Sequence, residues 1–491
     1  MTTHPYFTAL ADRPRSATNR PAWPPGLWLT QAVIPSAVLA KALIQFVCGP
    51  ALSGLMQVLA LLCGPWLAVV LAVALTGRGR GWLITHRHQV TALVLSSGLA
   101  LAVGGEGMVR LLGTTDDDGA LSFRHTMLRP YRLPTKAMRA ALKRYNETQT
   151  SILVYHPEIG WVPRPHFTTG DGVFSHNSAS IRTDSIDHEY EPLPPPDTLR
   201  ICIFGDSFTY GLTNNYQETI GPLLETKLRA RGIKTEVLNF GVISYGMDQA
   251  YLRWKKQGFR FAPQLVIFFC QLENRWRNLN FYFPLRYPGN NLPFTKPRYV
   301  LEGDSVRLLN VPCLSPEDSV ETLAHIEQWS LAPYESSFRA RDYQWHLWNV
   351  SKLLSYVEAR ATRQLEMSRH ARNSEDLCLA IIKMFHDDVV SSGARFLVVH
   401  APVPDEVATL RQLGIGLHES LLTKIAAISQ FVPTADEFVC RTRASSTDRL
   451  FDHTDHYSGL ANEIIADVAA WEILKDPPSR AARQTCLGSP P

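Results

Sequence analysis

The sequence lacks the main features of a nucleic-acid-binding protein and of a disulfide-stabilised one. Its 49 Lys and Arg nearly balance its 45 Asp and Glu, which gives a formal net charge of +4 over 491 residues. No dense basic stripe interleaved with aromatic residues is present, so nucleic-acid binding is disfavoured. The eight cysteines show no C-x-x-C spacing, which argues against a zinc ribbon and against a disulfide scaffold. A single Cys313–Cys440 bridge is left open.

Long apolar stretches are confined to the N-terminal part of the chain. Three of them are each long enough to cross a bilayer: about 27–48, 51–76 and 90–112. Arginines crowd the gap between the second and third stretches, and positive charge marks the cytoplasmic side of a span. The pattern predicts a cytoplasmic segment at 1–26, three transmembrane helices within 27–112, and an inner-membrane protein whose remainder is periplasmic. Core helices of a soluble domain are the alternative.

Two charged residues interrupt these stretches, Lys41 in the first and Glu106 in the third. Charged residues within a span are often functional, so a Lys41–Glu106 pair is one hypothesis. Both residues stand near the ends of their stretches, where snorkelling to the membrane surface is the simpler interpretation.

After residue 198 the sequence predicts an α/β domain with a parallel sheet between helices. Short β-branched and aromatic runs alternate with helical patterns, which is typical of a sheet covered on both faces. The predicted strands are 199–206, 235–241, 264–270 and 394–402, and the predicted helices are 216–231, 247–258, 375–391 and 459–474. We therefore place this domain at 199–474.

The remaining segments are interpreted from their composition. Residues 113–198 are polar and irregular apart from a predicted helix at 134–148, and they end in a proline-rich stretch typical of a linker or accessory segment. Residues 279–370 interrupt the alternation of strands and helices and are rich in Tyr, Trp and Pro, which suggests an insertion that caps the site. The tail at 475–491 is predicted to be disordered.

The first predicted strand ends in Gly205-Asp206-Ser207, at the edge of the sheet where active groups gather in open α/β folds. The segment GDSFTYG resembles the first motif of the SGNH/GDSL hydrolases, and the resemblance covers somewhat over half of the chain. It implies an SGNH-type sheet and a serine nucleophile, Ser207, at the start of a helix. Taken alone, Gly-Asp-Ser is also a common helix cap.

The segment NFGVISYGMDQ at 239–249 resembles the second motif of the same family. The family has a glycine there that donates its backbone N–H to an oxyanion, and in this sequence Ser244 occupies that position. The backbone donor is retained, although the conformational freedom of glycine is lost. Gly241 and Gly246 flank Ser244 as alternative donors.

The segment FFCQLENRWRN at 268–278 is the poorest match to the family. Glu273 and Asn274 stand where the family has an Asn-Asp pair whose asparagine also donates to the oxyanion. An anion at that position would oppose an oxyanion, so Asn274 is the preferred donor and Gln271 the weaker substitute. The alternative is that Glu273 and Asn274 only cap a loop or pair with neighbouring arginines.

The segment FDHTDHYSGLAN at 451–462 resembles the last motif of the family, an aspartate and a histidine before the final helix. His456 is the expected general base. Asp452 is preferred as the residue that orients its imidazole, and Asp455 is the alternative. These side chains and His453 also resemble a set of metal ligands, but the helical H-E-x-x-H spacing is missing, and we expect neither a metal nor a cofactor.

The resemblance implies an esterase or acyltransferase that uses Ser207, His456 and an aspartate. Its layout is similar to that of bacterial membrane proteins that add or remove O-acetyl groups on cell-surface polysaccharides, so we expect an acylated glycan as substrate and polysaccharide-synthesis proteins as partners. Aromatic residues around Trp161 and at 276–287 are candidates for stacking on sugars, although core packing is the commoner role. The alternatives are a lipid or thioester hydrolase and a catalytically silent SGNH-like module that binds polysaccharide or organises a synthesis complex.

Overall fold

The computed structural model describes residues 87–474, apart from residues 125, 149, 288, 289, 291, 304 and 443–448. The chain divides into two units, one of Met1–Gly113 with Ser351–Leu353 and one of Thr114–Val350 with Leu354–Pro491. The first two predicted spans and the tail at 475–491 therefore lie outside the described residues.

The described part of the first unit is mainly the helix α5 (Arg87–Leu112), which covers the third predicted span. No helix among residues 87–474 that the structure describes has both the length and the apolar character needed to cross a bilayer. Glu106 of α5 accepts hydrogen bonds from the Ser351 hydroxyl and from the backbone N–H groups of Lys352 and Leu353. Glu106 thus caps the first residues of a second helix, while Lys41 lies outside the described residues.

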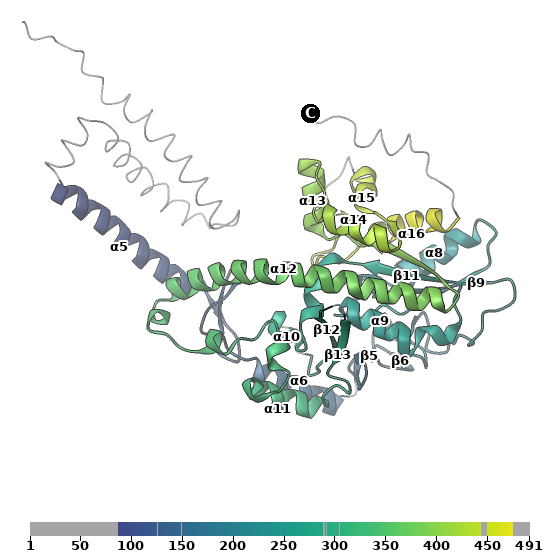
Figure 1. Cartoon of the computed structure of the whole chain (residues 1–491), viewed down its shortest axis with the longest axis horizontal. Coiled ribbons are helices and arrows are strands. Elements are labelled where there is room, and N and C mark those ends of the chain that lie inside the picture. Colours follow the sequence, from purple (N-terminus) through teal and green to yellow (C-terminus); the bar gives the residue numbers. More distant parts are fainter. Residues whose placement is uncertain are drawn as a thin grey trace, which may run out of the picture. The chain divides into compact units, whose positions relative to one another are not determined.

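Eight strands of the second unit form one sheet, in the order β15-β14-β11-β9-β10-β8-β7-β6 (Figure 1). Its five parallel strands are β9 (Leu199–Phe204), β10 (Thr235–Asn239), β11 (Leu265–Cys270), β14 (Arg395–His400) and β15 (Gln430–Val432). Four of them agree with the predicted strands, whereas the three residues of β15 are too few to show a period in the sequence. β9 pairs with β10 on one side and with β11 on the other, so the order of strands reverses at β9. In α/β folds, ligands bind beyond the carboxyl ends of the strands at such a point.

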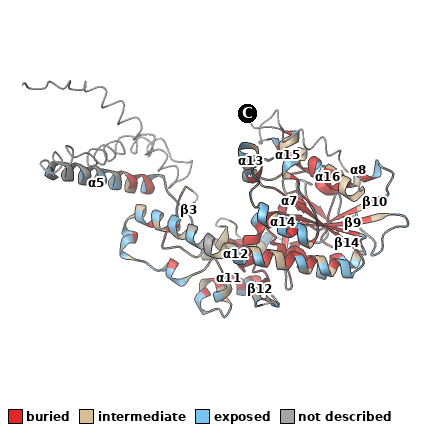
Figure 2. Ribbon diagram, turned by 45° about the horizontal axis from the view of Figure 1, so that its top comes forward, coloured by how far each residue is buried: buried red, intermediate tan, exposed pale blue. Residues whose placement is uncertain are grey.

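Alternate residues of the parallel strands face opposite sides of the sheet. Ile201 and Ile203 of β9 belong to one apolar cluster, which contains the inner faces of α8 (Ile220–Arg229), α13 (Pro404–Leu413), α15 (Ala435–Arg441) and α16 (Gly459–Leu474). Cys202 and Phe204 belong to another, which contains those of α9 (Met247–Lys256), α12 (Lys352–Ser391) and α14 (Glu419–Ile428). The strands are therefore buried on both faces (Figure 2), as expected for a parallel sheet between helices.

Residues 114–198 belong to the second unit and take part in its sheet, which corrects the expectation of a linker at 113–198. The strands β6 (Phe167–Thr168), β7 (Ser175–His176) and β8 (Arg182–Thr183) extend the sheet in antiparallel fashion beyond β10. Strands of two residues leave no alternation in a sequence, which explains why they were not predicted. The predicted helix is found as α6 (Thr135–Thr148).

Two further short strands, β4 (Leu153–His156) and β5 (Gly160–Pro163), form a hairpin in the same segment. Trp161 of β5 is fully buried, so its ring is part of the core. The sequence-based hypothesis that Trp161 stacks on a sugar is therefore wrong.

The insertion predicted at 279–370 has elements of its own. They are α10 (Phe283–Arg286), the hairpin of β12 (Arg298–Glu302) and β13 (Ser305–Leu309), α11 (Pro316–Ala324) and the first part of α12. α12 has 40 residues, so it starts well before the helix predicted at 375–391. An apolar cluster separate from the two clusters of the main sheet joins the insertion to α6 through Met138.

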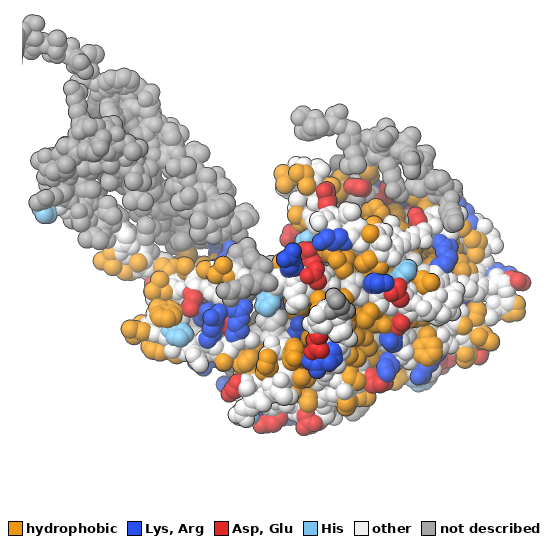
Figure 3. All heavy atoms as spheres, in the orientation of Figure 1, with side chains coloured by type: hydrophobic (Ala, Val, Ile, Leu, Met, Phe, Trp, Pro, Cys, Tyr) orange, Lys and Arg blue, Asp and Glu red, His pale blue; other side chains and the backbone are white. Residues whose placement is uncertain are grey.

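The surface and the cysteines agree with the reading of the composition. Acidic and basic side chains are interspersed over the visible face of the second unit, without a continuous basic area (Figure 3). Cys313 and Cys440, the pair left open by the sequence, are both free thiols.

Candidate active site

Ser207 lies directly after the carboxyl end of β9, as the first residue of the short helix α7 (Ser207–Tyr210). Asp206 is the N-cap of this helix, and its Oδ1 accepts a hydrogen bond of 3.0 Å from the backbone N–H of Phe208. Ser207 is 5% exposed, so only its hydroxyl side is open to a ligand. The strand and the cap together fix the serine at the point where the strand order reverses.

Neighbouring residues leave this turn almost no freedom. A Cβ atom on Gly205 would lie 2.1 Å from the hydroxyl oxygen of Thr209, so glycine is required for the turn to close. The buried Asn239 at the end of β10 donates from Nδ2 to the carbonyl oxygen of Thr209, at 2.8 Å. Its Oδ1 accepts a hydrogen bond of 2.9 Å from the backbone N–H of Gly241.

A buried arginine holds the other end of α7. Arg182 of β8 is 1% exposed and donates to the backbone carbonyl groups of Tyr210, Gly211 and Asn214. Its guanidinium also lies over the rings of Phe174 and Tyr210, at 4.8 and 4.7 Å from their centroids. Burial lowers the pKa of Arg182 to about 10, and the group remains charged at neutral pH. No motif or period in the sequence indicates this role of Arg182.

His456 approaches Ser207 from the loop before α16. The distance between Ser207 Oγ and His456 Nε2 is 3.0 Å, which is hydrogen-bond distance. The imidazole also stacks on the ring of Phe208, with the centroids 5.0 Å apart. The structure therefore brings the two principal residues expected from the sequence into direct contact.

The other ring nitrogen of His456 is held by Thr454. His456 Nδ1 is 3.0 Å from the backbone carbonyl oxygen of Thr454 and 2.9 Å from its Oγ1. A carbonyl oxygen only accepts, so this contact favours the tautomer with the proton on Nδ1. Nε2 is then free to accept the proton of the Ser207 hydroxyl.

Asp452 reaches the imidazole only through Thr454. Asp452 Oδ1 accepts hydrogen bonds from the Thr454 hydroxyl at 2.7 Å, the Thr454 backbone N–H at 2.8 Å and the His456 backbone N–H at 3.1 Å. Burial raises the pKa of the Asp452 carboxyl, but these hydrogen bonds outweigh it and leave the pKa below its usual value. Asp452 therefore orients the loop and the Thr454 hydroxyl, and it does not touch the ring.

Asp455, the other aspartate expected beside His456, is exposed and has a left-handed backbone with φ of 63°. Among the described residues, neither Asp452 nor Asp455 forms a hydrogen bond to the imidazole, so the triad is not assembled as the sequence suggested. The physical reason is the turn itself, which places the Thr454 carbonyl where a carboxylate was expected. His453 is also exposed, and residues 87–474, as far as they are described, contain no cluster of three His, Cys, Asp or Glu side chains placed to hold a metal.

Ser244 has a backbone conformation that glycine adopts more readily than any other residue. Its φ is 66°, in the left-handed region, where a residue with a side chain costs roughly 1–2 kcal/mol. Two side chains hold the flanking carbonyl groups. The buried Trp161 donates from Nε1 to Ile243 O at 3.0 Å, and the partly buried Arg277 donates from Nη1 to Tyr245 O at 2.9 Å. These contacts keep the Ser244 peptide in place despite its strain.

The remaining oxyanion candidates differ in their surroundings. Asn274 is 4% exposed, and its Nδ2 donates to Asp206 Oδ2 at 2.8 Å, which leaves the second N–H of the amide for a ligand. Glu273 points to solvent, and Gln271 is buried. Gly241 donates its N–H to Asn239, and a Cβ there would lie 2.5 Å from the backbone nitrogen of Tyr210. Gly241 is therefore needed for close packing, and the expectation that it is an oxyanion donor is wrong.

The geometry places a serine hydroxyl at hydrogen-bond distance from an imidazole at the carboxyl edge of a parallel sheet, and such a pair can act as nucleophile and base. No protein-family model matches the sequence, and no curated protein matches it.

Solved structures similar to this chain include three esterases or lipases. They are a GDSL-like lipase from Bacteroides thetaiotaomicron (11% identity, 57% of this chain and 89% of the other, TM-score 0.28), an acetyl-xylooligosaccharide esterase from Geobacillus (10%, 58% and 96%, TM-score 0.31) and the acetyl xylan esterase AlAXEase (11%, 56% and 100%, TM-score 0.30).

Proposed function

We propose that this chain is a serine esterase or acyltransferase of the SGNH/GDSL type that acts on O-acyl, in particular O-acetyl, groups of a glycan. The observation that supports it best is the contact of 3.0 Å between Ser207 Oγ and His456 Nε2, made by residues 249 positions apart in the sequence. The Thr454 carbonyl favours the tautomer of His456 with the proton on Nδ1. Nε2 is then free to accept the Ser207 proton, as a general base must.

In the proposed reaction, His456 Nε2 takes the proton of the Ser207 hydroxyl while Oγ forms a bond to the carbonyl carbon of the ester. The tetrahedral intermediate collapses as the bond to the alcohol oxygen breaks, and His456 returns the proton to that oxygen. Water or a sugar hydroxyl then attacks the acyl-serine, with His456 again as base, and this releases the acyl group as an acid or transfers it.

The backbone N–H groups of Ser207 and Ser244 and the free N–H of Asn274 are the proposed donors to the oxyanion. Donors held in place before the reaction stabilise the developing charge without reorganisation, and each is worth roughly 3–4 kcal/mol in well-studied sites. The network around Asp206, Asn239 and Trp161 supplies that rigidity here.

Labelling with a fluorophosphonate probe tests the nucleophile. We expect the purified full-length chain to be labelled, and Ser207→Ala and His456→Ala to lose labelling while they keep the thermal unfolding midpoint of the parent. Ser185→Ala is a matched control, because Ser185 is a serine of the same unit outside the site. An unlabelled but folded parent chain would contradict the proposal and favour the silent polysaccharide-binding module.

The class of ester is tested by comparing substrates. We expect p-nitrophenyl acetate and acetylated xylan to be deacetylated, and acetate to move to an added oligosaccharide if the enzyme is a transferase. Faster turnover of a long-chain acyl ester or of an acyl thioester would instead identify a lipid or thioester hydrolase.

We further propose that the three apolar stretches at 27–48, 51–76 and 90–112 cross the inner membrane and leave the catalytic unit in the periplasm. The proposal rests on the length of these stretches and on the arginines between the second and the third, since positive charge marks the cytoplasmic side. Fractionation of cells, followed by protease treatment of spheroplasts, tests this proposal. We expect the catalytic unit in the membrane fraction, and we expect protease added outside the spheroplasts to digest it. Recovery in the soluble fraction would contradict it.

A further inference from the structure

The second unit contains a cavity of about 490 Å³ that Ser207 and His456 do not line. Its walls come from α10, from the 3-10 helix at 272–279, from the loop at 336–337, from α12 and from the segment at 116–137 before and within α6. The volume is in the range of sites for small molecules. Most of the walls belong to the insertion, which the catalytic chemistry does not explain.

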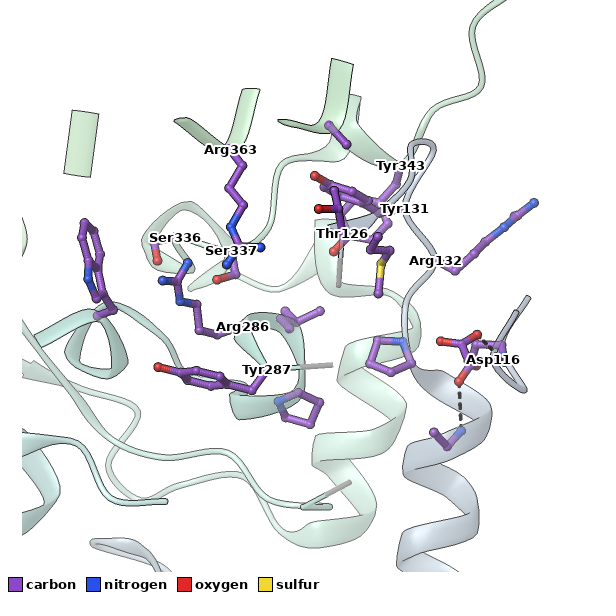
Figure 4. Close-up of a pocket in the computed structure, with 18 of the residues that line it drawn as sticks. Asp116, Thr126, Tyr131, Arg132, Arg286, Tyr287, Ser336, Ser337, Tyr343 and Arg363 are labelled. Atoms are coloured by element: carbon purple, nitrogen blue, oxygen red, sulfur yellow. Dashed lines mark hydrogen bonds between the residues drawn. The ribbon is translucent and has the colours of Figure 1, made fainter. Parts of the chain in front are cut away.

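Two arginines project into this cavity, Arg286 from α10 and Arg363 from α12. Figure 4 shows them converging on Ser336 and Ser337, with the ring of Tyr287 beside them. Among the described residues neither guanidinium has a carboxylate partner. The surrounding protein atoms, and next the positive charge of Arg286, lower the pKa of Arg363. Arg286 is half-buried and Arg363 is exposed, and both present a positive charge to the cavity, so an anion bound between them would relieve their mutual repulsion.

The two serines of the cavity have hydroxyl protons to donate. Ser336 Oγ and Ser337 Oγ each accept a hydrogen bond from Asn280 Nδ2, at 3.2 and 2.7 Å. The buried Glu335 fixes the loop at 336–337, because its carboxylate accepts hydrogen bonds from the backbone N–H groups of Phe281 and Ser337. Both Ser O–H groups are therefore available to a ligand that accepts hydrogen bonds.

Three aspartates line the cavity, Asp116, Asp117 and Asp118, and two of them are engaged in local hydrogen bonds. Asp118 accepts hydrogen bonds from the backbone N–H groups of Lys136 and Ala137, at the start of α6. Asp116 accepts from the backbone N–H groups of its own turn, Asp118 and Ala120. These carboxylates stabilise local structure, and Asp116 lies on the other side of the cavity from the arginines (Figure 4).

Aromatic rings provide the rest of the lining near the two charges. Trp276 has the guanidinium of Arg286 over its ring at 5.4 Å from the centroid. Tyr287, Tyr131 and Tyr343 also line the cavity. Such rings offer an apolar face to the C–H side of a sugar and a hydroxyl to its edge.

One arginine, Arg277, contacts both the cavity wall and the residue before Ser207. Arg277 Nη1 lies 3.6 Å from Asp206 Oδ2, and the Arg277 guanidinium lies 5.4 Å from the centroid of Tyr287. The residue before the nucleophile and the cavity wall therefore contact the same arginine.

We propose that this cavity binds an acidic sugar unit of the glycan, with Arg286 and Arg363 on its anionic group and Ser336 and Ser337 on the same oxygens. The inference names the substrate class and so deepens the proposed function, but binding in the cavity does not require Ser207 to be the nucleophile. A guanidinium pair binds a carboxylate or a phosphate equally well, and those two sources are separated by the choice of probe.

Binding is measured by isothermal titration calorimetry on the full-length chain with Ser207→Ala, so that no turnover occurs. The probes are trigalacturonic acid, its methyl ester, which has the same sugars without charge, and galactose 6-phosphate. We expect one of the two anions to bind, the carboxylate or the phosphate. If the carboxylate is the recognised group, the methyl ester is expected to bind at least about 10-fold more weakly than trigalacturonic acid.

The variants are Arg286→Gln with Arg363→Gln, and Arg260→Gln as an exposed control arginine outside the cavity. The double variant is expected to weaken binding of the anion about 10-fold or more and to reduce its dependence on salt, while Arg260→Gln changes neither. Equal affinity for the acid and its methyl ester, with no binding of the phosphate, overturns the proposal, as does unchanged anion binding by the folded double variant.

Fluorophosphonate labelling of the double variant separates the two proposals. Retained labelling with lost anion binding supports the cavity as a recognition site distinct from the chemistry. Loss of Ser207 labelling in the parent chain, with anion binding intact, would defeat the proposed enzyme and leave the acidic-sugar site standing.

Discussion

The two sides of the candidate site are built differently. Ser207 sits between a buried strand and a helix, and its neighbours are fixed by buried polar side chains from three other segments: Arg182, Asn239 and Asn274. His456 sits on a partly exposed loop, fixed by Asp452 and Thr454, which lie within four positions of it in the sequence.

Because of this difference, mutations on the serine side are expected to affect both folding and the reaction, whereas mutations on the histidine side are expected to affect mainly the reaction. On the serine side, one hydrogen bond lost also leaves a buried polar partner without a bond, which costs roughly 1–3 kcal/mol of stability. On the histidine side the same loss exposes groups to water, so the reaction is expected to suffer more than the fold.

The strongest separation is expected from His456→Ala. It removes the imidazole that contacts Ser207, so activity toward p-nitrophenyl acetate is expected to fall about 10³-fold or more. The thermal unfolding midpoint is expected to change little, because the ring is partly exposed. A large loss of stability would mean that the loop is a structural part of the core.

Asn239→Ala is expected to affect both properties. The variant removes the donor to the Thr209 carbonyl and the acceptor of the Gly241 N–H, which lie in the buried interior. We expect the free energy of unfolding to fall by about 1–3 kcal/mol in urea titrations, together with a loss of activity. Asn215→Ala is the control, since Asn215 is exposed and contacts only Glu218 among the described residues. Similar effects of the two variants would remove the distinction between the two sides.

Thr454→Val isolates the link between Asp452 and the imidazole. The variant keeps the backbone carbonyl that fixes the tautomer but loses the hydroxyl, so kcat is expected to fall about 10-fold while stability changes by less than about 0.5 kcal/mol. Thr454→Ser retains the hydroxyl and is expected to restore most of kcat. If both variants behave as the parent, Asp452 acts only on the loop backbone.

A smaller effect is expected in the pH dependence of stability, through His176 beside α7. His176 Nε2 is 2.8 Å from the Tyr210 hydroxyl, and burial lowers the pKa of His176 from 6.5 to about 3. The folded state therefore holds the ring neutral while the unfolded state gains a proton below pH 6.5. Stability from this group is present above pH 6.5 and is lost as the pH falls, by at most about 1.4 kcal/mol per pH unit, until about pH 3.

The measurement compares urea unfolding at pH 6.5 and pH 5.5 for the parent and for His176→Gln, which retains a polar neighbour for Tyr210 and does not titrate. The parent is expected to lose about 1 kcal/mol more than the variant over this interval. Asp452 affects stability at a lower pH than His176 does. Its pKa is depressed, so its stabilisation is present above the usual aspartate pKa and is lost only in stronger acid. An identical pH dependence of parent and variant would exclude His176 as the cause.

The serine side could largely be predicted from the sequence because its signals are local and periodic. A strand of six residues, five of them buried, is followed by Gly-Asp-Ser, so the sequence indicates both the strand and the point where it ends. The same held for β10, β11 and β14, each preceded or followed by a helix with a clear apolar face.

The rest depended on contacts that no period in the sequence records. Arg182 lies in a strand of only two residues. From the sequence alone, Trp161 is a candidate for stacking on a sugar, because the sequence does not reveal its hydrogen bond to the Ile243 carbonyl. The sequence does not single out Thr454 as the residue that contacts the imidazole. Its role depends on the backbone turn, in which Asp455 has a φ of 63°, rather than on the residue type at position 454.

Arg182 has a practical consequence for any attempt to dissect the protein. The three carbonyl groups it binds belong to the nucleophile's own helix and the turn after it, yet Arg182 precedes β9 by 17 positions. A fragment excised at Leu199, where the hydrolase-like alternation begins, would leave those carbonyl groups and the edge of β10 open to water. The smallest autonomous piece that keeps Ser207 in position therefore has to begin upstream of β6.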